Sequence, residues 1–228
     1  VRPHNQLGDL LLNVPAIRAI REQHPRAHIT LIVGPQNAPA VLAQRWVDEI
    51  RVLRGRGAWA AFREALRVGA RPDLSVYFST VSYSVSGALL AARAWARERI
   101  GFDPARWGRR DWAALTRVVP FPEGQPHQSE VSMGLARAAG AMAMPSPPYY
   151  VPDAGLLSRV PSGVAYLHPG AGKLKNRWSV DRFAEVARAL LARGLPVSVL
   201  EGPQDAGTAA ALTAAVGRQL PLVRGETV

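Results

Sequence analysis

The chain alternates short apolar runs with longer segments in which apolar residues recur every three or four positions. The short runs have the length of buried strands, and the longer segments have the period of helices. Alternation of this kind is typical of an α/β fold, in which helices cover both faces of a parallel sheet. We expect strands at 28–34, 49–53, 74–78, 99–102, 164–168, 196–200 and 220–223, and helices at 10–23, 38–44, 58–68, 84–96, 127–140, 180–193 and 206–218.

One residue disturbs the first expected helix. Pro15 lies inside its apolar stripe. A proline in a helix interior removes a backbone hydrogen bond and clashes with the preceding turn. We therefore expect helix 10–23 to be kinked at Pro15.

Residues 142–162 interrupt the alternation with a segment rich in proline and glycine, which is typical of a linker. The alternation restarts after it, and one local pattern returns. A strand leads into Gly-Pro-Gln-Asn-Ala at 34–38 and into Gly-Pro-Gln-Asp-Ala at 202–206, an offset of 168 residues. We expect two similarly built Rossmann-like domains, at 1–145 and 163–228, joined by a linker at 146–162. The second domain is short and the first lacks a full strand before Gly8, so we expect a fragment at both ends.

The composition narrows the possible functions. The net charge of +11 favours anionic partners, but the basic residues are spread along the chain and are not interleaved with aromatic residues, so we do not expect nucleic-acid binding. The absence of cysteine excludes a thiolate nucleophile and a disulfide scaffold. No apolar run reaches the roughly 18 residues of a membrane span, so we expect no membrane-spanning helix, and we expect no signal peptide. The five histidines have no zinc-site spacing.

The first candidate motif is Gly8-Asp9, at the entry of the first expected helix. A glycine at this place lets a ligand approach the backbone closely, and the carboxyl edge of an open α/β sheet is where ligands bind. The alternative is that Asp9 only stabilises the helix through its dipole.

The second motif follows strand 164–168 and reads Pro-Gly-Ala-Gly-Lys-Leu-Lys-Asn-Arg-Trp at 169–178. A glycine loop between a strand and a helix presents backbone N–H groups that bind phosphate. The only two lysines of the chain, Lys173 and Lys175, lie here with Arg177. The spacing matches neither a Walker A loop nor a dinucleotide fingerprint, and a solvated basic loop is the alternative. His168, at the strand end, is interpreted as structural.

Two segments resemble glycosyltransferase family 9, the ADP-heptose:lipopolysaccharide heptosyltransferases. They are QLGDLLLNVPAIRAIREQHPRAHITLIVGP at 6–35 and HPGAGKLKNRWSVDRFAEVARAL at 168–190. The resemblance implies a GT-B fold, with two Rossmann-like domains facing a cleft and the second domain incomplete in this chain. It also implies inverting sugar transfer from an ADP-sugar without a metal or other cofactor, which agrees with the absence of a D-x-D motif.

The resemblance assigns roles to particular residues. Asp9 matches the acidic residue proposed as general base, with Gly8 in the acceptor-side loop. The donor diphosphate would be held by Gly170, Ala171, Gly172, Lys173, Lys175 and Arg177. Asp205 follows the next strand, where such folds place an acid on the ribose, although it could equally cap a helix. The family's later acidic-Ser/Thr-Gly-x-x-His loop has no counterpart before Val228.

We therefore expect a heptosyltransferase-like enzyme of lipopolysaccharide biosynthesis with an anionic glycolipid acceptor. We expect it to be cytoplasmic and monomeric, with peripheral contact to the inner face of the inner membrane. The alternatives are another GT-B enzyme, such as a nucleotide-sugar epimerase, and a non-catalytic nucleotide- or polysaccharide-binding remnant.

Overall fold

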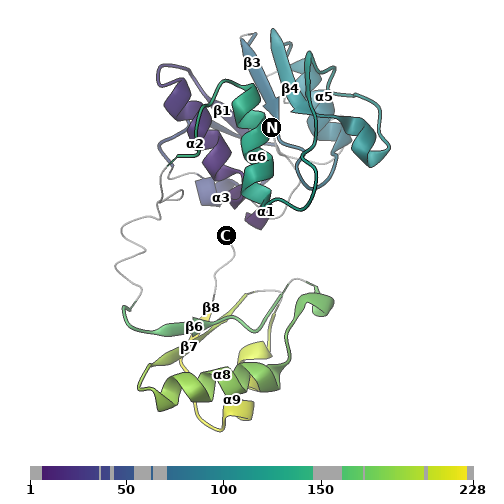
Figure 1. The fold of residues 1–228 in the computed structure, drawn as a ribbon. Helices are drawn as coiled ribbons and strands as arrows, with labels where there is room; N and C mark the ends of the chain where they lie inside the picture. Colours follow the sequence, from purple (N-terminus) through teal and green to yellow (C-terminus); the bar gives the residue numbers. More distant parts are fainter. Residues whose placement is uncertain are drawn as a thin grey trace. The chain divides into compact units, whose positions relative to one another are not determined.

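A computed structural model of the chain shows two compact units, Val1–Pro152 and Asp153–Val228 (Figure 1). The structure describes residues 7–35, 37–41, 44–53, 63, 71–145, 161–171, 173–202 and 205–224. Nearly all of the expected helix 58–68, most of the expected linker 146–162 and Gly172 lie outside these ranges. We describe each unit separately.

Every strand pair described in the first unit is parallel, which confirms the expected α/β class. One sheet has the order β1-β2 and the other has the order β3-β4-β5. The strands are β1 (Thr30–Val33), β2 (Glu49–Val52), β3 (Leu74–Tyr77), β4 (Glu98–Phe102) and β5 (Arg117–Val119). The sequence did not predict β5, because three residues that are mostly exposed carry no periodic signal.

The expected single helix at 10–23 is wrong in one respect. The structure has two helices, α1 (Leu7–Leu11) and α2 (Val14–Gln23), separated at residues 12 and 13. Pro15 lies in the first turn of α2 and does not kink a helix interior. A proline is well tolerated there, because the first turn needs no backbone donor for an intrahelical bond.

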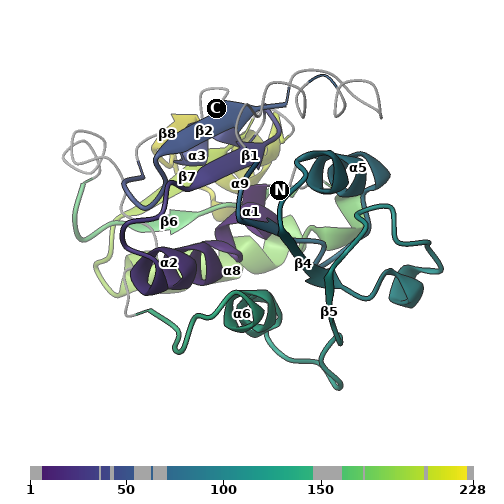
Figure 2. The ribbon, with the colours of Figure 1, turned by 90° about the horizontal axis from the view of Figure 1, so that it is seen from above.

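Helices cover both faces of the sheet β3-β4-β5. Successive residues of a strand point to opposite faces. Tyr77 packs with Ala88 and Ala91 of α5 (Val85–Arg93), whereas Phe78 belongs to the cluster that contains Met133 of α6 (Gln128–Ala138). Figure 2 shows α5 and α6 on either side of β4. The remaining described helices of this unit are α3 (Ala38–Val41) and the 3-10 helix η1 (Pro104–Trp107).

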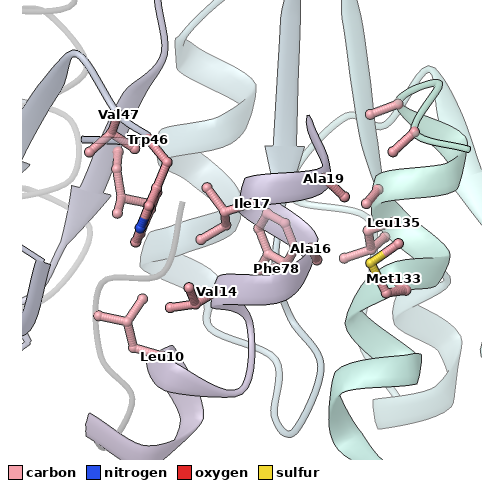
Figure 3. Packing of buried hydrophobic residues seen from close by; sticks show 14 of the residues in the cluster. Leu10, Val14, Ala16, Ile17, Ala19, Trp46, Val47, Phe78, Met133 and Leu135 are labelled. Carbon is pink, nitrogen blue, oxygen red and sulfur yellow. The ribbon is translucent and has the colours of Figure 1, made fainter. Parts of the chain in front are cut away.

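The larger core lies between α2, α6 and the strands. Val14 and Ile17 of α2 and Leu135 of α6 point into the same cluster as Phe78, and all four are at least nine-tenths buried (Figure 3). Burying an aliphatic or aromatic side chain contributes about 1.5–3 kcal/mol. The apolar spacing on α2 is therefore explained by this contact with α6.

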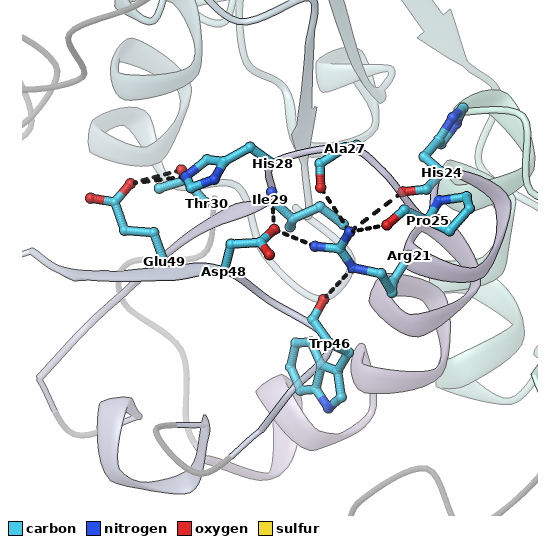
Figure 4. A network of polar contacts seen from close by, with 10 residues as sticks. All are labelled: Arg21, His24, Pro25, Ala27, His28, Ile29, Thr30, Trp46, Asp48 and Glu49. Atoms are coloured by element: carbon cyan, nitrogen blue, oxygen red, sulfur yellow. Dashed lines mark hydrogen bonds and ion pairs between the residues drawn. The ribbon is translucent and has the colours of Figure 1, made fainter.

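At its C-terminal end, α2 is tied to the first sheet by Arg21 (Figure 4). The guanidinium donates to the carbonyl oxygens of Ala27 at 2.7 Å and of Pro25 and Trp46 at 3.2 Å, and it pairs with Asp48. The Ile29 N–H and Arg21 hold the pKa of the Asp48 carboxyl below its usual range. Arg21 therefore joins the chain segments before β1 and β2.

Replacing Arg21 with lysine is expected to lower the free energy of unfolding by about 2–3 kcal/mol, because an ammonium cannot bridge several carbonyls at once. Chemical denaturation measures the effect. Arg182→Lys is the control, because Arg182 has an exposed i,i+3 pair with Glu185 that a lysine can also make. Equal stability of the two variants would contradict the bridging role.

The second unit has one parallel sheet of order β6-β7-β8. The helices α8 and α9 pack against each other and against the sheet. Their shared core contains Ala184, Ala187, Val199 and Leu212. The elements are β6 (Ala165–Leu167), η2 (Leu174–Asn176), α8 (Val180–Ala192), β7 (Val197–Glu201), α9 (Thr208–Val216) and β8 (Leu222–Arg224). In the described part of the chain, no helix has the length and hydropathy needed to span a membrane.

Candidate functional site

The second unit brings two loop segments together at the carboxyl ends of β6 and β7. These strands are parallel neighbours, so the residues that follow them meet at one edge of the sheet. His168 follows β6, and its Nε2 lies 2.7 Å from Oδ2 of Asp205, which comes after β7. The His168 side chain is 49% exposed and the Asp205 side chain only 6% exposed. This edge of the sheet therefore has a half-exposed imidazole that is hydrogen-bonded to a buried carboxylate.

Asp205 is the polar centre of this edge. Its Oδ2 also accepts from the Gly202 N–H at 3.3 Å, and Nη2 of Arg177 lies 3.9 Å from its Oδ1. The hydrogen bonds from His168 and the Gly202 N–H, together with the charge of Arg177, hold the pKa of Asp205 below its usual range against the opposing effect of burial. Asp205 is therefore an anion throughout the neutral pH range.

Gly170 is required by the position of Asp205. A Cβ atom at residue 170 would lie 2.1 Å from Cγ and 2.5 Å from Cβ of Asp205. Real Cβ contacts are never this short, so only glycine lets the loop pass over the carboxylate.

Asp205 does not cap α9. The N-cap residue is Gly207, and the orphan N–H groups of Gly207 and Ala209 donate to Oε2 of Glu201, each at 3.0 Å. Glu201 is the last residue of β7 and is 94% buried. The capping alternative for Asp205 is therefore wrong, because the helix end is already satisfied by another carboxylate.

The basic residues of the loop lie between β6 and α8. Lys173 and Lys175 are exposed, in and beside the short helix η2. Arg177 is half-buried, and its Nε donates to the Ala171 carbonyl at 3.2 Å. Two flexible cations and one anchored cation therefore follow the glycine loop.

In the first unit, Asp9 is half-buried in the first turn of α1. Its main-chain carbonyl accepts a hydrogen bond from Nδ2 of Asn13 at 2.8 Å. Oδ1 of Asn13 in turn accepts from the hydroxyl of Ser132 on α6, and both side chains are buried. The break between α1 and α2 is thereby fixed to α6, which holds the main chain of Asp9 in place.

No protein-family model matches the chain. The chain is 24% identical to lipopolysaccharide heptosyltransferase 3 of Escherichia coli over 231 aligned positions, which cover 95% of this chain and 67% of that protein. A crystal structure of a family 9 glycosyl transferase from Veillonella parvula superposes with a TM-score of 0.78 at 16% identity, over 99% of this chain and 69% of that one.

Two heptosyltransferase structures from E. coli also match the fold of this chain. ADP-heptose LPS heptosyltransferase II has a TM-score of 0.72 at 19% identity, over 99% of this chain and 72% of its own. Heptosyltransferase WaaC with ADP-2-deoxy-2-fluoro heptose has a TM-score of 0.72 at 16% identity, over 100% of this chain and 78% of its own.

The chain is thus similar, at low sequence identity, to heptosyltransferases and to a family 9 glycosyl transferase. Its α/β fold with parallel sheets is that of the GT-B heptosyltransferases, matched over about 70% of their chains. The resemblance noted from the sequence is thus confirmed by both the distant sequence match and the fold.

The family resemblance alone did not point to His168 and Glu201. Both were identifiable in principle, since each lies at the end of an expected strand and the carboxyl ends of neighbouring parallel strands meet. Among the residues that the structure describes, no group of three or more His, Cys, Asp or Glu could hold a metal ion.

Gly8 offers a test of the ligand-approach interpretation. A Cβ at Gly8 would meet no atom within 4 Å, and the residue is helical, so Gly8→Ala is expected to leave stability unchanged or raise it by up to about 1 kcal/mol. If a ligand approaches the backbone here, the same variant weakens acceptor binding, measured as a rise in the acceptor KM at constant thermal stability. An unchanged KM would remove Gly8 from the acceptor side.

Proposed function

We propose that the chain belongs to an inverting glycosyltransferase that needs no metal and moves a heptose or related sugar from an ADP-sugar to a lipopolysaccharide-core-type acceptor. The observation that carries the proposal is the loop after β6, where a glycine fitted over a buried carboxylate is followed by three cations. The fold of the chain also supports the proposal, because it matches that of E. coli heptosyltransferase WaaC, whose structure was determined with ADP-2-deoxy-2-fluoro heptose.

The reaction is a single displacement. The acceptor hydroxyl oxygen bonds to the anomeric carbon while the bond from that carbon to the diphosphate oxygen breaks, so the configuration inverts. The hydroxyl proton passes to the Asp9 carboxylate, and ADP leaves with the bonding electron pair. Positioned general bases of this kind contribute about 10²- to 10⁴-fold to rates.

The leaving group needs stabilisation, because negative charge develops on the diphosphate as the glycosidic bond breaks. Lys173 and Lys175 supply mobile point charges, and Arg177 supplies a fixed planar donor set. The backbone of Gly170 and Ala171 approaches the phosphates, since Gly170 places no side chain between them. In this proposal the loop of the second unit binds the donor diphosphate, and Asp9 of the first unit takes the proton of the acceptor hydroxyl.

The net charge of +11 supports an anionic glycolipid acceptor and peripheral contact with an anionic membrane surface. We further propose that the enzyme is a cytoplasmic monomer at the inner leaflet. Long-range electrostatic attraction draws the positively charged protein to the anionic acceptor and membrane surface, and added salt screens this attraction.

The two lysines give a direct test. Lys173→Ala and Lys175→Ala are each expected to weaken binding of ADP-glucose about tenfold, because each removes a charge-assisted contact with the diphosphate. Calorimetry measures the affinity. Arg97→Ala, which removes an equally exposed cation from the first unit, serves as the matched control and is expected to bind normally.

If neither lysine variant binds more weakly than the control, the diphosphate site lies elsewhere. A nucleotide-binding remnant is distinguished by normal ADP-glucose affinity without turnover of any ADP-sugar. An epimerase is distinguished by conversion of the ADP-sugar in the absence of an acceptor.

A further inference from the structure

The environment of His168 is typical of a histidine that binds a ligand: its ring is half-exposed and hydrogen-bonded to a buried carboxylate. One ring nitrogen, Nε2, is fixed 2.7 Å from the buried Asp205 carboxylate, and about half of the side chain is exposed. The two nitrogens of an imidazole lie on different sides of the ring. The contact with Asp205 therefore orients Nδ1 away from the carboxylate, at the first residue of the loop that carries Gly170, Lys173 and Arg177.

The carboxylate decides which nitrogen carries the proton. An ionised carboxylate only accepts hydrogen bonds, so the neutral ring of His168 keeps its hydrogen on Nε2. Nδ1 then offers a lone pair. A phosphate oxygen is also an acceptor, so it can bond to Nδ1 only after the ring gains a second proton.

The charges around the ring favour that step when an anion is present. Among the described residues, Asp205 contacts the ring at 2.7 Å and Arg177 lies 3.9 Å from the other carboxylate oxygen of Asp205, so the charges of these two groups cancel. The main-chain N–H of Gly202 donates to the same carboxylate at 3.3 Å. Protonation of the ring makes this cluster net positive and adds a donor that faces outward.

We propose that His168 is a further donor-binding residue, whose Nδ1 donates to the diphosphate of the ADP-sugar, so that binding takes up a proton at His168. This inference rests on the proposed function, because it needs a diphosphate at the loop. Asp205 acts through the ring and is a positioning residue. The pair thus adds a pH-dependent contact to the constant charges of Lys173 and Lys175.

The test is isothermal titration calorimetry of the protein with ADP-glucose at about pH 8, in two buffers of different ionisation enthalpy. Both phosphates of this probe are esterified, so the probe itself does not titrate in this range. The expected result is an uptake approaching one proton per bound molecule. The affinity is expected to rise as the pH falls from about 8 to about 6, by up to about tenfold per pH unit.

Three variants test whether the proton taken up on binding goes to His168. His168→Gln can still contact Asp205 but has no titrating group, and it is expected to lose the uptake and about tenfold in affinity at pH 6. Asp205→Asn lets a neutral ring carry its hydrogen on Nδ1, so uptake falls while affinity at pH 8 is retained. His28→Gln is the control, since His28 is an exposed histidine of the first unit beside Glu49, and it should behave as the unchanged protein does.

Each outcome is decisive. If ADP-glucose binds with no proton uptake, or if His168→Gln retains both uptake and affinity, the role of His168 is wrong and the proposed function stands. If ADP-glucose does not bind at any pH, the proposed function fails and this inference fails with it. Loss of uptake in His168→Gln but not in His28→Gln supports the proposal.

Discussion

Replacing Asp9 with asparagine is expected to reduce sugar transfer by about 10²- to 10⁴-fold while leaving the affinity for the ADP-sugar nearly unchanged. The amide has the shape of the carboxylate but cannot take the acceptor proton. The change is made at a half-buried residue whose main chain is held separately by Asn13, so the fold should be preserved. The measurement combines a single-turnover transfer assay with calorimetry of donor binding.

Asp73→Asn is the matched control, because the Asp73 side chain is 92% exposed in the same unit. It is expected to transfer sugar at the normal rate. Turnover by Asp9→Asn at the rate of this control would exclude Asp9 as the general base, and loss of donor affinity would instead indicate a role in binding.

Replacing Gly170 with alanine is expected to have the largest effect on the second unit. The new methyl carbon would lie 2.1 Å from Cγ of Asp205, which is buried and bonded to His168. Either the loop lifts or Asp205 moves, and overpacking of this kind costs about 1–3 kcal/mol. We expect lower thermal stability and at least tenfold weaker binding of ADP-glucose, measured by differential scanning calorimetry and isothermal titration calorimetry.

A second substitution separates this cause from others. Asp205→Gly in the Gly170→Ala background removes every atom within the short contacts, so stability is expected to recover while donor binding stays weak. Asp205→Ala should rescue less, because Cβ of residue 205 would still lie 2.5 Å from the new methyl carbon. A Gly170→Ala protein with normal stability and affinity would contradict the packing described above.

The course of the backbone could largely be predicted from the sequence. The mainly apolar segments at 74–78 and 99–102 became β3 and β4, because strands covered by helices on both faces are rich in apolar residues. β5 escaped prediction because its Arg-Val-Val segment is an exposed edge that only pairing with β4 defines. The break before α2 also escaped, because a buried Asn13–Ser132 contact across 119 residues stabilises it.

The candidate site was predictable as a loop and not as a set of contacts. The glycines and cations of residues 170–177 are local in sequence, so their spacing could be interpreted directly. The pairing of His168 with Asp205 joins residues 37 positions apart and depends on the order β6-β7. The capping of α9 by Glu201 was missed for a different reason: the contact is local, but Asp205 lies nearer to the start of the expected helix and was therefore weighed as its cap.

The central claim is that the diphosphate of an ADP-sugar binds at the loop of residues 170–177. A crystal structure of the protein with an unreactive ADP-sugar measures this directly. We expect the phosphate oxygens within hydrogen-bonding distance of Lys173, Lys175 or Arg177. A diphosphate bound away from this loop would contradict the account.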